Sequence, residues 1–414
     1  MGRFVAEGIE KLGPQRYRAW WREKATGKRR SKVVHGSLED AKAFRKAMFD
    51  AQERGAYVAP DALTVGDYLE AWMLRVQTMG EIADSTQERH ASLLAPIIAH
   101  LGAVPLQQLT KGQIEDYYAT CLKTERTRLG RLISGDTVNK RHVVFRRALE
   151  DACFEEPPLI QRNPAARAIH PPPARPRGVA WTSDEAQVVL AAVHGSWLDL
   201  PVSIALHTGM RIGEVIGLRW RDVHLPSSGP GHLYVSGIVK ETKAGVQRVA
   251  YGKTKHARRR LAISAELADA LRAARKEQAE RRLLLGVGWE DSGLVVCGRR
   301  GQVLRPSKVS GRFSPVVAML EAEGVLATEG ATFHSLRHTH ATLLLRAGVP
   351  VHIVSARLGH SKIQITLDYY GHVIPGDDEA VAASFAGMLS FYASDAVHTV
   401  CTFEAASDRE AASG

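Results

Sequence analysis

The stretch HTGMRIGEVIGLRW, residues 207–220, places an arginine at the start of a helix, and the interpretation of the whole chain depends on it. A glycine turn precedes Arg211, and apolar residues follow at the spacing of one helix face. Arg211 and Glu214, three residues apart, share the face opposite these apolar residues, where the carboxylate can hold the guanidinium. Because a guanidinium binds phosphate through paired hydrogen bonds, the stretch indicates a phosphate site. Taken alone, the pair is more simply a surface ion pair.

The stretch GKTKHARRRLAI, residues 252–263, carries two lysines in a predicted turn before a strand. Lys253 or Lys255 could extend from such a turn into a nucleic-acid groove and place an ammonium group beside a leaving oxygen. A solvated basic turn is the simpler alternative for this stretch alone.

The stretch TFHSLRHTHATLLLRAGVP, residues 332–350, predicts a helix that ends near Gly348. His334, Arg337 and His338 share one face of this helix, because they are three and four residues apart. The two histidines also have the spacing of a zinc pair. No glutamate lies between them, however, and Arg337 would put a cation beside the metal, so we expect no metal site.

The stretch RLGHSKIQITLDYYGHV, residues 357–373, ends one helix at a glycine and places His360 directly after it. Tyr369 and Tyr370 follow nine and ten residues later. A tyrosine on a helix is by itself usually a core or interface residue. The order of the four stretches therefore carries more information than any one of them.

Together the four stretches suit phosphodiester exchange. A phenol with a pKa of about 10 attacks phosphorus poorly at neutral pH unless cations stabilise the developing charge and a base takes its proton. Two arginines can neutralise the non-bridging oxygens, and a lysine or histidine can protonate the departing sugar oxygen. Because a phosphotyrosyl bond preserves the phosphodiester for rejoining, we expect no metal, ATP or other cofactor.

The ordered set Arg…Lys…His-x-x-Arg…His…Tyr resembles the tyrosine recombinases of the phage integrase family, over about residues 60–390. Residues 1–56 resemble the small arm-site DNA-binding domain that many such integrases carry. The resemblance implies that Arg211 and Arg337 clamp the phosphate and that Lys253 protonates the 5′ oxygen. His334 would assist proton transfer, His360 would hydrogen-bond the scissile phosphate, and Tyr370 would be the nucleophile. Glu214 falls where the family places a supporting acidic residue.

Two of these assignments have a rival. The family's nucleophile is usually followed, after one residue, by His and an aliphatic residue, and this favours Tyr370, which precedes Gly-His-Val. A nine-residue gap after the histidine of Leu-Gly-His, found in some members, would select Tyr369 instead. Lys255 is the weaker rival of Lys253.

The patterns predict a multidomain, mainly α fold. Residues 1–56 should form a small β-sheet plus helix, because Arg16, Arg18 and Arg22 alternate with apolar residues in QRYRAWWR and an apolar helix face follows Ser37. We expect a helical domain at 62–161, a proline- and arginine-rich linker at 162–178, an α+β domain at 179–390 and an acidic tail at 391–414. The resemblance implies that the helical domain is a core-binding (SAM-like) domain and that the α+β domain is the catalytic domain. In the second domain, the last helix should expose its basic residues, Lys140, Arg141, Arg146 and Arg147.

The charge distribution agrees with a nucleic-acid partner. The 414 residues include 55 Lys and Arg against 44 Asp and Glu, a net charge of +11. Residues 1–56 carry +7 and residues 375–414 carry −6, so the DNA-facing charge is larger than the total suggests. No run of about 18 apolar residues or signal peptide is evident, and four scattered cysteines form no metal or disulfide pattern. We therefore expect a cytoplasmic protein with no membrane partner.

The resemblance implies an integrase that cuts and rejoins double-stranded DNA at core and arm attachment sites through a 3′-phosphotyrosine. It also implies a homo-tetramer on DNA, with an excisionase and a host DNA-bending protein as accessory factors. Three alternatives remain: a type IB topoisomerase with the same chemistry, a non-catalytic DNA-binding protein on a recombinase scaffold, and a metal-dependent nuclease. The last needs clustered carboxylates, of which the four stretches supply only Glu214.

Overall fold

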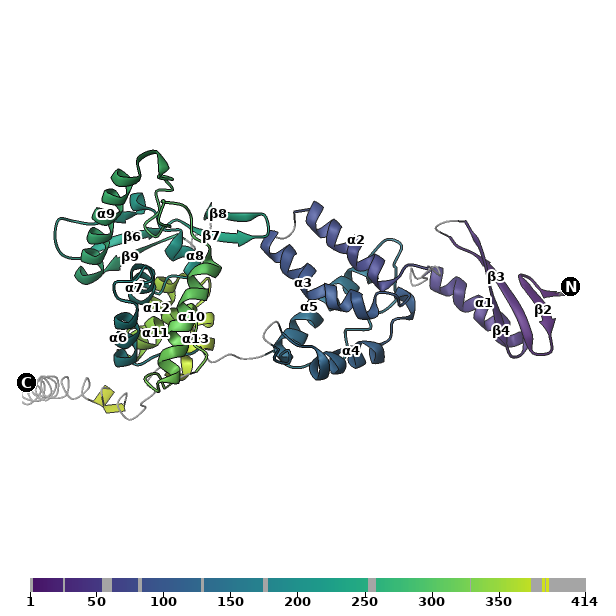
Figure 1. Ribbon diagram of the computed structural model, residues 1–414. Coiled ribbons are helices and arrows are strands. Elements are labelled where there is room, and N and C mark those ends of the chain that lie inside the picture. The colour runs from purple at the N-terminus through teal and green to yellow at the C-terminus, as the bar shows by residue number, and fades with distance from the viewer. Residues whose placement is uncertain are drawn as a thin grey trace, which may run out of the picture. The chain divides into compact units, whose positions relative to one another are not determined.

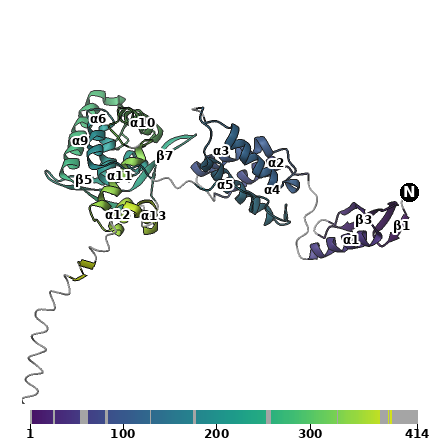
Figure 2. The same ribbon diagram turned by 90° about the horizontal axis from the view of Figure 1, so that it is seen from below.

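The computed structural model describes most of the 414-residue chain, in two compact units, Met1–Pro176 and Arg177–Gly414 (Figures 1 and 2). The described residues are 3–24, 27–53, 62–80, 84–127, 130–173, 178–251, 258–327, 329–373, 382–383 and 385–386. Within these ranges no helix is both long enough and apolar enough to cross a membrane. The predicted acidic tail at 391–414 lies outside them.

A four-stranded antiparallel sheet and one helix form the start of the first unit. The strands run in chain order, β1 (Arg3–Ala6), β2 (Ile9–Gly13), β3 (Arg16–Arg22) and β4 (Arg29–His35), and α1 (Leu38–Glu53) follows. Ser37 begins α1 as the sequence predicts, since its backbone N–H donates to the Asp40 carboxylate and its hydroxyl accepts from the Asp40 N–H. The alternation in QRYRAWWR predicted β3, whereas no sequence pattern singled out β1 or β2.

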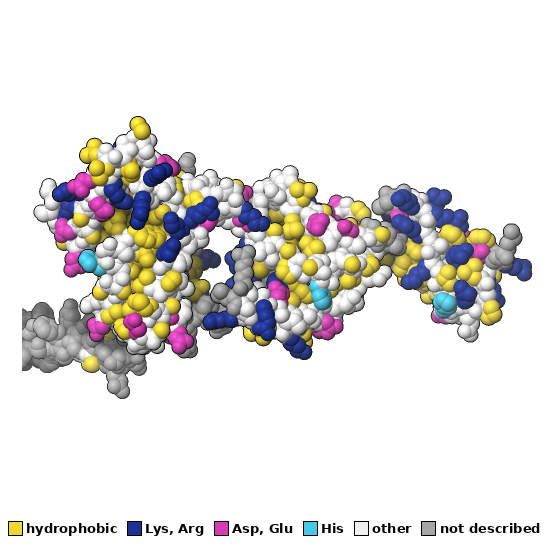
Figure 3. Space-filling view, viewed as in Figure 1, with side chains coloured by type: hydrophobic (Ala, Val, Ile, Leu, Met, Phe, Trp, Pro, Cys, Tyr) yellow, Lys and Arg dark blue, Asp and Glu magenta, His cyan; other side chains and the backbone are white. Residues whose placement is uncertain are grey.

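The two faces of this sheet differ sharply in polarity. Ala19 and Trp21 of β3 are buried, and the Trp21 ring meets Phe44 of α1 edge to face at 5.9 Å. The alternate residues of β3 point the other way, because side chains along a strand alternate between its faces. On that face the Arg29 guanidinium lies 4.2 Å from the centroid of the Trp20 ring. Figure 3 shows Lys and Arg side chains gathered over this sheet.

Among the described residues, the rest of the first unit consists of four helices and one 3-10 turn. They are α2 (Val65–Thr78), α3 (Asp84–Leu101), η1 (Leu106–Gln108), α4 (Lys111–Thr124) and α5 (Gly135–Cys153). Thr64 and Thr110 begin α2 and α4 with capping boxes. The helices close around fully buried side chains such as Trp72, Ile114 and Phe145.

The prediction that the basic residues of α5 are exposed is wrong for Arg141. Arg141 is 5 % exposed and donates from both terminal nitrogens to the Glu125 carboxylate, which follows α4. Its position, three residues after buried Val138, turns it toward the core, whereas Val143 is exposed. The hydrogen bonds from Arg141 lower the pKa of Glu125, so the pair stays ionised. Lys140 and Arg146 are exposed as predicted.

The second unit combines helices with two small sheets. Its elements are α6 (Ser183–Val193), α7 (Asp199–Thr208), α8 (Ile212–Ile216), η2 (Trp220–Asp222), β5 (Val223–His224), β6 (Gly231–Val235), β7 (Gly237–Thr242), β8 (Gly245–Ala250), β9 (Arg259–Ile263), α9 (Ala265–Leu285), η3 (Gly286–Gly288), α10 (Pro306–Ala322), α11 (Phe333–Arg346), α12 (Val351–Leu358), α13 (Ile363–Tyr370) and η4 (Gly371–Val373). One antiparallel sheet has the order β5-β6-β9, and β7 pairs with β8 in a hairpin.

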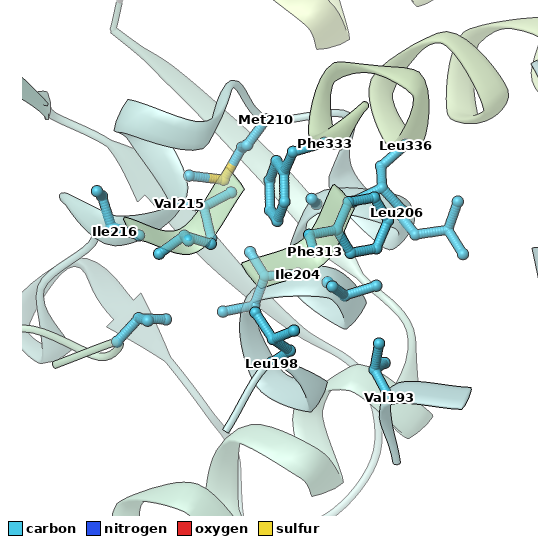
Figure 4. Packing of buried hydrophobic residues seen from close by; sticks show 14 of the residues in the cluster. Val193, Leu198, Ile204, Leu206, Met210, Val215, Ile216, Phe313, Phe333 and Leu336 are labelled. Carbon is cyan, nitrogen blue, oxygen red and sulfur yellow. The ribbon is translucent and has the colours of Figure 1, made fainter. Parts of the chain in front are cut away.

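Two apolar clusters fix α11 in this unit. In the larger one the rings of Phe313 from α10 and Phe333 from α11 meet edge to face at 5.5 Å, and Leu336 lies beside them (Figure 4). The smaller cluster joins α11 to α12 and α13 through Ala341, Leu345, Val354, Leu358 and Tyr370. Polar side chains on α11 are therefore held from both sides by packed elements, which limits how far they can move.

Candidate active site

Arg337 on α11 is a buried cation at the centre of the site. It is 2 % exposed and donates to the carbonyl oxygens of Gly209, at 2.6 Å, and Leu358, at 2.9 Å. These carbonyls lie at the C-terminal ends of α7 and α12, where the helix dipole is negative. Burial and then the charge of Arg211 lower the pKa of Arg337 to about 9, so it remains protonated at neutral pH.

Two glycines shape the turns around this guanidinium. Gly209 and Gly359 have φ values of +67° and +71°, in the left-handed region that other residues avoid. A Cβ at Gly209 would also lie 2.7 Å from the His340 ring, and one at Gly359 would lie 2.8 Å from Nη1 of Arg259. Both turns therefore require glycine.

Glu214 is the buried anion of the site. It is 1 % exposed, so the pair with Arg211 is not the surface ion pair that the stretch alone would suggest. Nη1 of Arg211 donates to Glu214 at 3.3 Å, and Arg259 donates to both carboxylate oxygens at 3.1 and 2.9 Å. The Tyr251 hydroxyl adds a further hydrogen bond of 2.8 Å. Burial alone would raise the pKa of Glu214, but Arg259 and then Arg211 outweigh it and lower the pKa to about 2.

His360 connects Arg337 to α13. Its Nε2 lies 2.9 Å from Nη2 of Arg337, and its Nδ1 lies 2.8 Å from the Thr366 hydroxyl. Because Arg337 can only donate, Nε2 accepts and we assign the ring proton to Nδ1. Burial and then Arg337 lower the pKa of His360 to about 4, so the ring is neutral at pH 7.

Tyr370 ends α13 with its hydroxyl facing α11. The side chain is 4 % exposed, and its hydroxyl lies 2.8 Å from Nδ1 of His338. Burial raises the pKa of Tyr370 to about 12, although Arg337 acts in the opposite direction. Tyr369, the rival nucleophile, is 45 % exposed, with its ring centroid 6.1 Å from that of His338.

The structure brings together Arg211, Arg337, His360 and Tyr370, which come from three of the four stretches. His334 lies at the start of α11, exposed, and its ring is 4.8 Å from the His338 ring, edge to face. Desolvation by the surrounding protein lowers the pKa of His334, and the charges of Arg337 and Arg211 lower it further. Lys253 and Lys255 belong to 252–257, outside the described residues.

Sequence reasoning did not single out Arg259 or Tyr251, both of which bond Glu214, and it missed the role of His338. Arg259 is in phase with buried Leu261 and Ile263 on β9, and this alternation places it on the inner side. His338 was considered only as half of a zinc pair and not as a partner of tyrosine. In the part of the chain that the structure describes, no group of three or more His, Cys, Asp or Glu residues is arranged to hold a metal ion.

Residues 181–375 match the phage integrase family. An integrase of Streptomyces ambofaciens is 29 % identical over 359 residues, which are 83 % of this chain and 86 % of the relative. The ICEBs1 integrase of Bacillus subtilis is 23 % identical, over 69 % of this chain and 72 % of the relative.

Solved structures share the fold. The Tn1549 transposon integrase in complex with a circular intermediate DNA has a TM-score of 0.61 at 18 % identity, covering 79 % of this chain and 99 % of that one. A lambda integrase tetramer bound to a Holliday junction has a TM-score of 0.53 at 19 % identity, covering 91 % of this chain and 98 % of that one. The chain therefore has the fold of the tyrosine recombinases.

Proposed function

Because residues 181–375 belong to the phage integrase family, we propose that this chain is a site-specific tyrosine recombinase that integrates and excises a mobile DNA element. The observation that carries the proposal is the joint placement of two arginines and a tyrosine from separate elements. Buried Arg337 and helix-capping Arg211 supply fixed positive charge, and Tyr370 ends a helix packed against the one that carries Arg337.

The proposed reaction exchanges one phosphodiester bond for another. The Tyr370 oxygen forms a bond to phosphorus, the bond from phosphorus to the 5′ oxygen breaks, and the 5′ oxygen leaves with a proton. Arg211 and Arg337 offset the negative charge that builds on the non-bridging oxygens. We assign protonation of the leaving oxygen to Lys253, assisted by His334, and contact with the scissile phosphate to His360. The number of ester bonds is unchanged, so the step needs no ATP, and the two arginines supply the positive charge that a metal ion would otherwise provide.

Tyr370 is preferred over Tyr369 as the nucleophile. Its hydroxyl already has a proton acceptor in His338, and its ring is fixed in the cluster that joins α11, α12 and α13. Tyr369 points to the exposed side of the same helix. A fixed nucleophile reacts faster, because the entropy of orienting it has been lost before the reaction begins.

The first unit is proposed to contact double-stranded DNA by its basic surfaces. The open face of β3, with Arg16, Arg18 and Arg22 around Trp20, would contact arm-type sites, and the exposed basic residues of α5 would contact core sites. We further propose that the working form on DNA is a homo-tetramer, and that an excisionase and a host DNA-bending protein control its direction.

The test uses a nicked suicide substrate built from the DNA that flanks the coding sequence. The wild-type chain should form a covalent protein–DNA adduct in the presence of a chelator. Tyr370→Phe should abolish the adduct while binding persists, and Tyr369→Phe should retain it. An adduct that Tyr370→Phe retains and Tyr369→Phe loses would refute the nucleophile assignment. Binding without any adduct would indicate a DNA-binding protein, and relaxation of an arbitrary supercoiled plasmid would indicate a topoisomerase.

A further inference from the structure

The hydroxyl of Tyr370 has a defined hydrogen-bond partner, His338, to which the resemblance assigns no role. Nδ1 of His338 lies 2.8 Å from the hydroxyl oxygen, a distance typical of a strong hydrogen bond. His334 lies one turn earlier on α11, and its ring meets the His338 ring edge to face at 4.8 Å. His338 therefore contacts both His334 and the nucleophile.

The ring of His338 can accept a proton at the nitrogen that faces Tyr370. Burial, followed by the neighbouring His334 and Arg337, lowers the pKa of His338 to about 4, so the ring is neutral at pH 7. A neutral imidazole carries one proton, and a hydroxyl that donates to Nδ1 leaves that proton on Nε2. The groups around the ring are His334 and Arg337 from α11, and Tyr369 and Tyr370 from α13.

The backbone before α6 holds this ring in place. A Cβ built on Gly178 would lie 2.4 Å from Nδ1 of His338 and 2.5 Å from its Cε1. The Cα of residue 178 therefore packs directly against the ring, beside the nitrogen that faces Tyr370. A side chain at this position would have to displace the ring from the tyrosine, so the glycine preserves the hydrogen bond.

Tyrosine requires such a base. With a pKa of about 12, a fraction of only about 1 in 10⁵ of Tyr370 is ionised at pH 7. The phenol becomes more acidic as its oxygen bonds to phosphorus, so an acceptor with a low pKa can take the proton within the transition state. A nitrogen that is already hydrogen-bonded to the hydroxyl needs no rearrangement to do so.

We propose that His338 is the general base of the cleavage step, an inference that rests on the proposed recombinase function. The O–H bond of Tyr370 breaks, its proton moves to Nδ1 of His338, and the oxygen forms its bond to phosphorus. The bond to the 5′ oxygen breaks, and that oxygen takes a proton from the separate acid, Lys253 assisted by His334. Rejoining reverses each transfer, with His338 returning the proton to the phenol.

The experiment measures adduct formation by full-length variants on the nicked substrate between pH 6.5 and 9.5. His338→Asn keeps a hydrogen-bond acceptor near the position of Nδ1 but cannot take a proton. His334→Asn is the comparison variant, because it changes the acid side of the reaction and leaves the partner of Tyr370 in place. At pH 7, His338→Asn should slow cleavage about 10²- to 10⁴-fold, while DNA binding measured by gel shift is unchanged. Its rate should rise about tenfold per pH unit with the phenolate fraction, whereas the wild-type rate should stay flat.

A substrate with sulfur in place of the 5′ bridging oxygen separates the base from the acid. A thiolate leaves without being protonated, so this substrate should relieve the defects of Lys253→Ala and His334→Asn and leave that of His338→Asn unchanged. A His338→Asn rate equal to that of the wild type, or a defect that the sulfur substrate relieves, would overturn the proposal.

Gly178→Ala provides an independent variant that leaves both reacting groups intact. The added methyl should displace the ring, slow cleavage and produce the same rising pH profile, and a wild-type profile would contradict the assignment. If the wild-type chain forms no adduct on either substrate, the proposed recombinase function itself fails. That result is distinct from an active wild type whose His338 and Gly178 variants behave normally.

Discussion

Replacement of Glu214 by glutamine tests the electrostatic design of the site. The carboxylate is buried among Arg211, Arg259 and Tyr251, and its pKa falls from 4.5 to about 2. At about 1.4 kcal/mol for each pH unit, this difference corresponds to about 3 kcal/mol of stability at neutral pH. Glu214→Gln removes the charge and leaves Arg259 as a buried cation without an anion, so a loss of about 3–5 kcal/mol is expected at pH 7.

The contribution of Glu214 to the free energy of unfolding must fall as the pH is lowered. Because the folded-state pKa of Glu214 lies below its unfolded-state value, the contribution is complete above pH 4.5 and is lost as the pH falls toward 2. Between pH 5 and pH 3 the wild type should therefore lose about 2 kcal/mol that the glutamine variant does not lose. The difference in the free energy of unfolding between the two proteins should shrink by that amount.

Urea-induced unfolding of the full chain measures this difference in the free energy of unfolding. The value is taken from the unfolding transition whose midpoint the variant shifts. Glu277→Gln is the matched control, since Glu277 also faces an arginine, Arg281, but is 70 % exposed on α9. Its effect should stay below about 1 kcal/mol at every pH. A loss of less than 1 kcal/mol for Glu214→Gln at pH 7, or a loss that does not change with pH, would refute the account of Glu214 as the site's buried anion.

Three further variants test other parts of the structure. Gly209→Ala should lower the free energy of unfolding by at least about 1–2 kcal/mol, because its φ is left-handed and the new Cβ would meet His340; an unchanged urea midpoint would contradict this. Glu125→Gln should cost about 1–3 kcal/mol in the same assay, since it leaves the buried Arg141 without its anion, and a neutral effect would show that the pair is dispensable. Arg337→Lys should reduce adduct formation on the nicked substrate about 10²- to 10³-fold with DNA binding intact, because one ammonium cannot span the contacts of a guanidinium; near-normal cleavage would argue against a clamping role.

Local patterns were sufficient to predict most elements of the fold. Alternation in QRYRAWWR predicted β3, and Ser37 predicted the start of α1. Gly359 predicted the end of α12. Each of these signals depends on residues within one or two turns, so it can be read directly from the chain.

Local patterns did not predict the structure where the burial or pairing of a residue depended on a partner distant in the sequence. Arg141 has the position of an exposed basic residue in its own helix and is buried because Glu125 lies opposite it. The first two strands, β1 and β2, are short and weakly alternating, and they are stabilised by pairing with each other and with β3. Pairing of this kind is a property of the sheet and not of the single strand.

The sequence by itself determined which chemical groups can form the site: two arginines, a tyrosine and several histidines, in an order that indicates phosphodiester exchange. Only the tertiary structure decided which of these side chains contact one another. It buried Glu214 between Arg211 and Arg259, and it placed His338 rather than His334 at the Tyr370 hydroxyl. The reason is physical, because spacing along a helix determines which residues share a face, whereas the packing of α11 against α13 determines which of those residues meets the nucleophile.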